Sequence, residues 1–331
     1  MADITVNEIT LHILDASGAG LILADEPLKD SGEFLSYIEN HLKKMLSTDS
    51  ASQVFFNEEH DNNIEKDVDS LKESHDVNGF GKKLAKQIYA CMERNMEDIP
   101  SGDLVIASFY DHDTSEEGIA LLKLDYDMSY THDSDHNTTS IKKARYLLPA
   151  GNKKINDKLV IYPDSERMYL TEKVRKIEGT STPYFSQAFG LKKSMSVDAK
   201  IKFISKGIAS ASAFMDDGIN KQVAVKKAMS EQLEDSGCID MKTVIQDVFD
   251  NDTDRESVKS YLEQYHLETT KLQPKAEDTQ KKLSTIQITA DKDIHINLPM
   301  DIYDSSEFEI STAPDGTSEV RLTGILELVV K

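Results

Sequence analysis

The chain opens with alternating apolar and polar residues that predict a β-strand. Apolar side chains recur at nearly every second position over residues 4–13, which places them on one face of a strand. A glycine-containing turn leads to a second predicted strand at 21–23. After Asp30 or Ser31, which we expect to cap a helix, apolar residues keep 3.6-residue spacing as far as Met45.

Paired apolar runs predict two β-hairpins further along. Residues 104–109 and 119–124 are almost continuously apolar, which is typical of strands buried on both faces. Residues 158–162 and 168–170 flank a turn that contains proline. Within residues 57–92, helical spacing predicts a polar surface helix followed by a more apolar one.

Helical patterns dominate residues 201–267, where we predict four helices. One ends at Gly237, one is capped by Asp240, and one begins with capping-box spacing between Thr253 and Glu256. The last two have the layout of a helix-turn-helix. Four aspartates in this part would repel DNA, so we do not expect it to read bases.

Strand patterns return after a linker that begins at Gln273. Short runs predict strands at 285–289, 293–298, 307–310 and 318–322, and a strand or short helix at 325–330. The patterns together predict an α+β fold in three parts: an N-terminal domain at 1–180 with helices around a mixed or antiparallel sheet, a helical subdomain at 181–273, and a small β-rich domain at 274–331.

Composition favours a folded, soluble protein. Of the 331 residues, 39% are hydrophobic and 29% charged, within the range of globular proteins. We expect a cytoplasmic protein without a membrane segment, because the sequence has no long apolar run and no basic-then-apolar leader. Cys91 and Cys238 have no nearby cysteine, so we expect free thiols rather than a disulfide or a zinc site.

The distribution of charge along the chain says more about possible partners than the net charge does. A net charge of −21 argues against non-specific DNA binding, which depends on lysine and arginine. However, residues 97–135 hold eleven acids and one lysine, whereas residues 141–158 hold six basic residues and one acid. A basic face on an acidic body is therefore compatible with the sequence.

Another basic stretch, residues 182–206, is the first candidate for a DNA-binding surface. It sets five lysines against a single acid, Asp198. Its aromatic residues Tyr184, Phe185 and Phe189 are predicted to be core rather than platforms for base stacking. The candidate DNA-binding residues are Lys192, Lys193, Lys200, Lys202 and Lys206, with Lys142, Lys143 and Arg145 from the basic stretch at 141–158.

Residues that could carry chemistry are sparse. His112, beside Asp111 and Asp113, and the later His132 and His136 could bind a divalent cation. The same residue types are ordinary in solvated loops, so we predict no metal site. Metal binding by the three histidines is kept as an alternative. The sequence has no nucleophile elbow, P-loop, dinucleotide fingerprint or zinc-protease motif. We therefore predict no enzymatic activity and no cofactor.

Four segments, spread over nearly the whole chain, resemble a known protein family: residues 4–14, 104–124, 184–190 and 286–298. In order and spacing they resemble the NdpA-like family of bacterial nucleoid-associated proteins. The resemblance implies a non-enzymatic protein of the nucleoid that binds double-stranded DNA and acts as a homodimer. The alternative is an acidic interaction module whose segment 97–135 binds a basic or DNA-binding protein, or mimics DNA.

Overall fold

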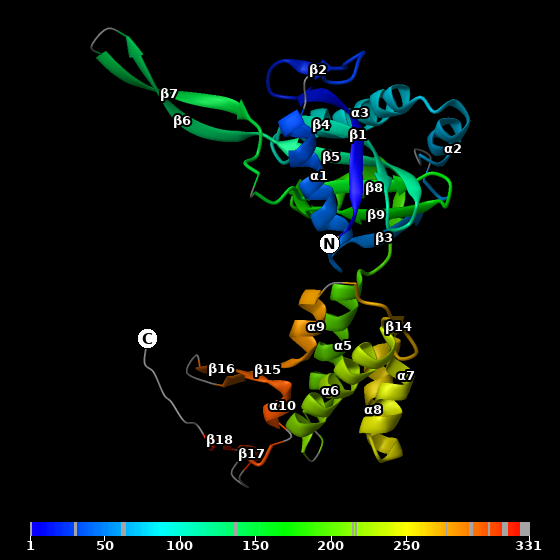
Figure 1. The fold of residues 1–331 in the computed structure, drawn as a ribbon, viewed down its shortest axis with the longest axis vertical. Helices are drawn as coiled ribbons and strands as arrows, with labels where there is room; N and C mark the ends of the chain where they lie inside the picture. Colours follow the sequence, from blue (N-terminus) through cyan, green and yellow to red (C-terminus); the bar gives the residue numbers. More distant parts are fainter. Residues whose placement is uncertain are drawn as a thin grey trace. The chain divides into compact units, whose positions relative to one another are not determined.

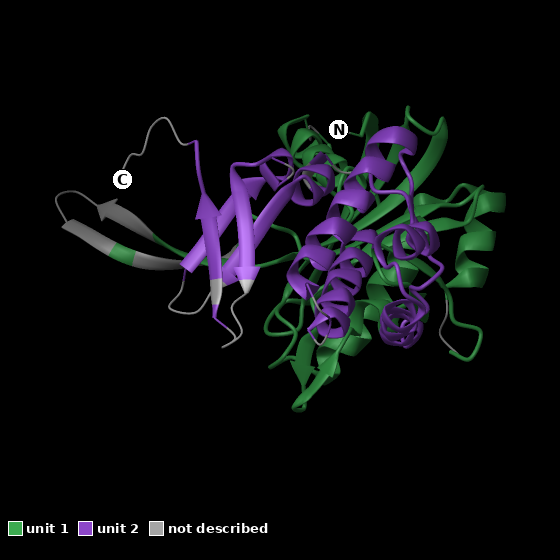
Figure 2. Ribbon diagram, turned by 90° about the horizontal axis from the view of Figure 1, so that it is seen from below, with its two compact units in different colours: residues 1–196 green, residues 197–331 purple. Residues whose placement is uncertain are grey.

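The computed structural model divides the chain into two compact units, Met1–Ser196 (unit 1) and Val197–Lys331 (unit 2) (Figure 2). The structure describes residues 2–29, 32–60, 64–135, 138–151, 153–213, 215, 217–275, 277–290, 294–303, 305–312 and 317–324. At 131–135, 138–140, 142–146, 278, 290, 312 and 318 the description covers the backbone alone. The three-domain division at 180 and 273 stays a prediction about which parts fold independently.

Unit 1 is built on an eight-stranded sheet in the order β12-β3-β9-β8-β5-β4-β1-β2 (Figure 1). Every neighbouring pair is antiparallel, so the sheet is antiparallel rather than mixed. Its strands are β1 (Ile4–Asp15), β2 (Gly20–Ile22), β3 (Ser52–Phe56), β4 (Gly102–Asp111), β5 (Glu116–Asp125), β8 (Asp157–Tyr162), β9 (Arg167–Thr171) and β12 (Leu191–Lys193).

Helices cover both faces of this sheet. Because successive side chains of a strand point to opposite faces, Leu121 joins one core and Leu122 the other. Helix α1 (Gly32–Leu46) packs on the Leu122 face, and α2 (Glu65–Ser74), α3 (Val77–Arg94) and α4 (Tyr184–Ala188) contribute to the core on the Leu121 face. The apolar runs predicted to be doubly buried strands are therefore confirmed as β4 and β5.

Two short ribbons complete unit 1. β6 (Asp127–Asp135) pairs with β7 (Thr138–Leu147), and β10 (Arg175–Ile177) pairs with β11 (Thr180–Thr182), each as a separate two-stranded sheet (Figure 1). The segment with His132 was predicted to be a polar loop, and this was wrong. This segment is a strand that pairs with β7. Its residues are mostly polar, so no sustained apolar alternation marks the strand in the sequence.

Unit 2 begins with four helices, as predicted: α5 (Val197–Ser212), α6 (Gly218–Ser236), α7 (Met241–Val248) and α8 (Asp252–Glu263). Gly237 ends α6 with a left-handed φ of 69°, and the Asp240 side chain accepts a hydrogen bond from the Lys242 amide at 3.1 Å. The predicted capping box of α8 is wrong. Asn251 caps that helix and accepts from the Asp254 amide at 2.8 Å, so α8 begins earlier than expected.

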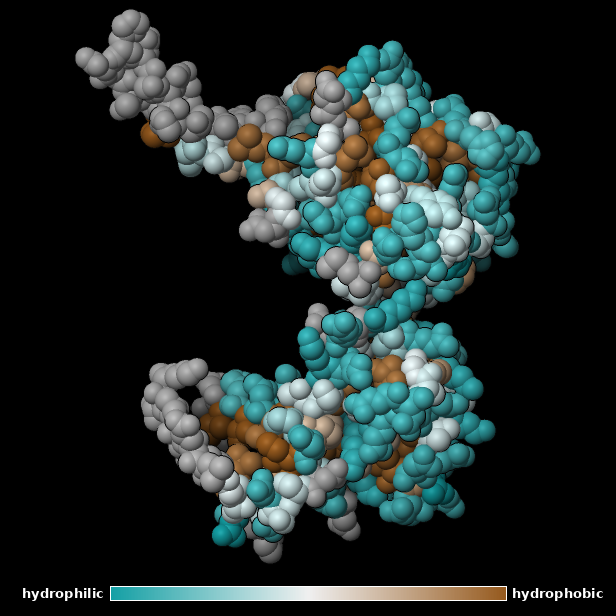
Figure 3. All heavy atoms as spheres, in the orientation of Figure 1, coloured by the Kyte–Doolittle hydropathy of each residue, from teal (hydrophilic) through white to brown (hydrophobic). Residues whose placement is uncertain are grey.

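The rest of unit 2 is a set of short elements around a small apolar core. The elements are β13 (Ile239–Asp240), β14 (Lys271–Leu272), α9 (Glu277–Leu283), β15 (Thr285–Ala290), β16 (Ile294–Pro299), α10 (Met300–Tyr303), β17 (Phe308–Thr312) and β18 (Ser318–Leu322). Val223 of α6 joins Ile286, Leu298 and Phe308 in this core. Half-buried Ile288 and Ile296 border it, and hydrophobic side chains show at the surface of this part, while most of the visible surface is hydrophilic (Figure 3).

The predicted α+β class is confirmed, and most predicted strands and helices are present. The strand patterns of residues 285–322 correspond to β15–β18. Several elements were not predicted, among them β3, β6, β7, β10, β11, α4, β12, β13, β14, α9 and α10. The expected cap at Asp30 or Ser31 and the last predicted element, 325–330, lie outside the described residues.

Candidate nucleic-acid interface

The aromatic residues of the basic stretch form core, as predicted. Tyr184, Phe185 and Phe189 are each 0% exposed. Their rings meet edge to face, with centroids 6.1 Å apart for the first pair and 5.1 Å for the second, a favoured geometry for buried aromatic pairs. No face of these rings is available for stacking on a nucleic-acid base.

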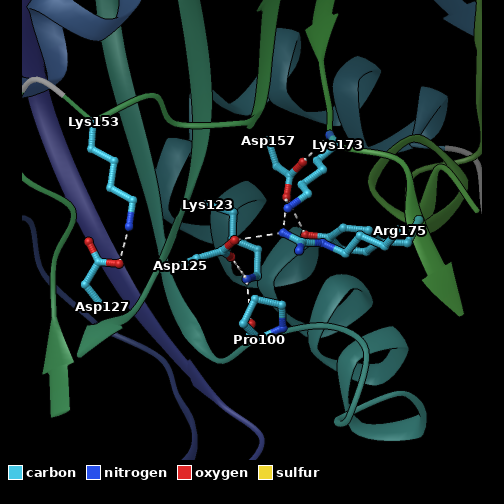
Figure 4. Close-up of polar contacts among 9 residues, drawn as sticks. Pro100, Lys123, Asp125, Asp127, Lys153, Asp157, Lys173 and Arg175 are labelled. Carbon is cyan, nitrogen blue, oxygen red and sulfur yellow. Dashed lines mark hydrogen bonds and ion pairs between the residues drawn. The ribbon is translucent and has the colours of Figure 1, made fainter.

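A buried ionic network holds this part of unit 1 together (Figure 4). The Tyr184 hydroxyl donates to Asp157 Oδ2 at 2.7 Å, and Arg175 donates to the same oxygen at 3.2 Å and to Asp125 Oδ2 at 2.7 Å. The Lys123 ammonium, which is 0% exposed, also donates to Asp125. Burial raises the pKa of Tyr184 well above its ordinary value, and the Asp157 carboxylate adds to this rise. The network therefore fixes α4, and the chain that follows it, to β8.

The first two candidate lysines lie on β12, at the edge of the sheet. Lys192 pairs in register with Phe55 and Lys193 with Val54 of β3, and both lysines are exposed. Lys193 Nζ lies 3.6 Å from the buried carboxylate of Glu172, so its charge is partly offset. Within the part of the chain that the structure describes, Lys192 has no ion pair.

The next three candidates lie on α5 in unit 2. Lys202 Nζ is 2.7 Å from Asp198 Oδ2, and Lys282 Nζ of α9 is 3.2 Å from the other oxygen of the same carboxylate. Burial opposes ionisation of Asp198, but the hydrogen bonds from the two lysines outweigh it and lower its pKa. Lys200 and Lys206 make no ion pair with any described residue. The sequence pattern did not indicate Lys282, because its partner lies 84 residues away.

Lys142, Lys143 and Arg145 lie on β7. In the register of the hairpin, Lys142 pairs with Thr131 and Lys143 with Tyr130. Their side chains lie outside the described residues, so these three remain candidates by sequence.

Of the three histidines considered for a metal, the structure describes the side chain of His112. It is exposed, its Nε2 lies 2.9 Å from Thr5 Oγ1, and its ring meets Tyr110 edge to face. The His132 side chain and the whole of His136 lie outside the described residues. Among those described, no three His, Cys, Asp or Glu side chains are grouped to hold a metal ion.

The acids of segment 97–135 are largely engaged within unit 1. Asp103 accepts from the Tyr126 hydroxyl and Asp111 from the Tyr162 hydroxyl, both at 2.6 Å. The remaining engaged acids contact basic side chains or backbone amides: Asp98, Asp113, Glu116, Asp125 and Asp127. Most acids of this segment whose side chains are described therefore serve the fold.

A further group of lysines gathers near the end of α1. Lys44 on α1 and Lys153, Lys154 and Lys158 line one cavity. Lys153 pairs with Asp127 (Figure 4), whereas the other three make no ion pair among the described residues. The sequence indicated the basic run at 141–158, which includes three of these lysines. It did not indicate Lys44, which lies near them because α1 packs against the sheet.

A family match covers nearly the whole chain. No helix among the described residues is long and apolar enough to cross a membrane. No curated protein matches the chain. A family model described as nucleoid-associated protein YejK matches residues 10–327, nearly the whole sequence. The chain therefore belongs to the nucleoid-associated protein YejK family.

Proposed function

We propose that this protein binds double-stranded DNA in the bacterial nucleoid through phosphate contacts, without catalysis and with little dependence on base sequence. Family membership supports the nucleoid-associated role. The buried aromatic rings and the aspartates of the helix pair α7–α8 favour backbone contacts over base recognition.

The observation that carries the proposal is that three candidate lysines have no ion-pair partner among the described residues. On a chain of net charge −21, Lys192, Lys200 and Lys206 have no carboxylate within ion-pair distance among the described residues. A lysine without a partner retains its charge for a phosphate, whereas Lys193 and Lys202 already face carboxylates. Among the five candidate lysines of 182–206, we therefore assign the DNA contacts first to these three.

The acidic interaction module has less support. Its segment, 97–135, directs Asp103 and Asp111 at tyrosine hydroxyls and Asp125 at basic side chains of unit 1. Carboxylates engaged in this way are poorly placed to bind a basic partner or to imitate the phosphates of DNA.

We also propose a homodimer, formed through the β6–β7 hairpin. Met128, Tyr130 and Ile141 of this hairpin are 67%, 74% and 71% exposed. An isolated two-stranded ribbon is marginally stable in water, and exposed apolar side chains on it favour an interface. A second copy of the same hairpin would cover these residues symmetrically.

The DNA proposal is tested by a triple variant, Lys192→Glu, Lys200→Glu and Lys206→Glu. We expect it to lose retention of linear duplex DNA in a gel shift at low salt. The matched control changes three exposed lysines, Lys66, Lys86 and Lys242, to glutamate. It has the same total charge and should keep most of the binding. Equal binding by the two triple variants would reject this assignment.

The salt dependence gives a second test. If wild type neutralises five to eight phosphates, the slope of log affinity against log salt should be roughly −4 to −7. A slope near zero would contradict binding through phosphates.

A further inference from the structure

Unit 1 contains a cavity of about 200 Å³ between the end of α1 and the strands β8 and β9. Its walls include His41 and Lys44 of α1, Lys153 and Lys154 of the loop before β8, Lys158 of β8, and Thr171 of β9. Among the described residues that line it, none carries a carboxylate. A water molecule occupies about 30 Å³ of liquid, so the cavity has room for a small polyatomic ion.

Lys158 is a buried cation without a counter-ion. It is 6% exposed, and its Nζ donates one hydrogen bond, to the backbone oxygen of His41 at 3.3 Å. No carboxylate lies within ion-pair distance of it among the described residues. Burial, together with the nearby charges of Lys154 and Lys44, lowers its pKa to about 8. A buried charge is costly unless it is paired, so an anion in this cavity would offset an existing cost.

Two residues that line the cavity also carry an unsatisfied polar atom. His41 Nε2 and Thr171 Oγ1 are buried and have no hydrogen-bond partner among the described residues. Buried polar atoms are nearly always hydrogen-bonded. Burial, with the nearby charges of Lys158 and Lys44, lowers the pKa of His41 to about 4, so its ring is neutral and one ring nitrogen carries a proton that it can donate.

The sheet register brings these groups together. Lys158 is the direct cross-strand partner of Thr171, and directly opposed residues of an antiparallel pair share a face. Helix α1, which carries His41, packs over that face. An ammonium and a hydroxyl from the β8–β9 hairpin and an imidazole from α1, 117 residues before Lys158, thus border one cavity.

We propose that this cavity is a phosphate-binding site, with Lys158, His41 and Thr171 as donors to the phosphate oxygens. Phosphate fits better than a carboxylate for two reasons. It offers more acceptor oxygens than a carboxylate, and its charge suits a site where Lys44 and Lys154 add two more cations at the entrance. The phosphate comes either from the DNA backbone, in which case the site rests on the proposed function, or from a small phosphorylated molecule.

The first experiment measures thermal stability with inorganic phosphate against chloride at equal ionic strength. Phosphate at about 100 times its Kd should raise the Tm of wild type by roughly 5 °C. Lys158→Met removes the buried charge at similar volume, so it should fold at least as well as wild type and lose the phosphate shift. Thr171→Val, which removes one hydroxyl, should bind phosphate several-fold more weakly. Lys86→Met, at an exposed position of α3, should keep the full shift.

The second experiment identifies the source of the phosphate. If the backbone of DNA supplies it, Lys158→Met should weaken duplex binding about tenfold, and inorganic phosphate should compete beyond the effect of ionic strength. If a small molecule supplies it, Lys158→Met should leave DNA binding unchanged, while a nucleoside monophosphate stabilises wild type and not the variant. No phosphate shift in wild type, or an equal shift in Lys158→Met, would overturn the site. Neither result bears on DNA binding by Lys192, Lys200 and Lys206, which the gel shift of the triple variant tests separately.

Discussion

Asp157 and Arg175 form an ion pair inside unit 1, with a guanidinium nitrogen 3.2 Å from the Asp157 Oδ2. Their side chains are 1% and 8% exposed. The same carboxylate accepts from the Tyr184 hydroxyl at 2.7 Å and from the Lys173 amide at 2.8 Å. Because every partner of Asp157 is a donor, its negative charge is what keeps this cluster together.

Asp157→Asn should destabilise unit 1 strongly. The amide keeps the shape of the carboxylate but presents an NH₂ group to donors and leaves Arg175 less compensated. Breaking a buried pair costs about 3–5 kcal/mol, which lowers Tm by roughly 10 °C in a unit of this size. Near-ultraviolet circular dichroism of the tyrosines would follow the transition. Asp164→Asn, on an exposed turn, is the control and should change Tm by less than about 2 °C.

Asp198→Asn should strengthen DNA binding. The substitution removes the carboxylate that Lys202 and Lys282 share, so both ammonium groups become available to phosphates. The log–log salt slope should steepen by about one to two. Glu256→Gln is the control, because it removes an equal charge from a different pair, with Lys259 on α8. Weaker DNA binding by Asp198→Asn would exclude α5 from the interface.

Stability should decrease as pH falls from about 6.5 toward 4, in part because of His12. Burial, with a smaller effect of Lys82, lowers the pKa of His12 from 6.5 to about 4. The unfolded chain therefore binds a proton in this window that the folded chain does not. In this window, each unit by which the pH falls lowers the free energy of unfolding by up to about 1.4 kcal/mol through this residue. Above pH 7 this residue does not change the free energy of unfolding.

His12→Asn provides the check on that histidine. His12 Nδ1 accepts from the Ala24 amide at 3.2 Å, and an asparagine oxygen can take over this role without titrating. Urea unfolding at pH 7.5 and pH 5.0 should show a smaller loss for the variant than for wild type. An identical loss in both proteins would show that His12 is not neutral in the fold or does not titrate in this window.

Replacing the exposed apolar residues of the β6–β7 hairpin should separate the proposed dimer. Tyr130→Ser with Ile141→Ser removes two side chains that are more than 70% exposed, so folding of unit 1 should change little. Light scattering after size exclusion should give the dimer mass for wild type and the monomer mass for the variant at micromolar concentration. Phe55→Ser, at a 51% exposed position on β3, should remain dimeric. A monomeric wild type would refute the dimer outright.

Sequence patterns predicted the elements whose apolar residues repeat. β4 and β5 were recognisable because strands buried on both faces are apolar throughout, and α6 because Gly237 marks its end. β3 and β12 were not recognisable, since each is short and lies toward the edge of the sheet, where polar residues such as Lys192 are tolerated. β6 and β7 were not recognised because most of their residues are polar, so neither strand carries a sustained apolar alternation.

The charge of the chain, the aromatic core at Tyr184, Phe185 and Phe189, and the family resemblance could all be obtained from the sequence by itself. Which lysines remain unpaired was decided by the tertiary structure. Lys193 meets Glu172, Lys202 shares Asp198 with a lysine of α9, and Lys158 lies across from Thr171 beneath α1. The reason is physical: a lysine's free energy with an anion depends on burial and on neighbouring charges within a few ångströms, and those neighbours come from segments far away in the chain.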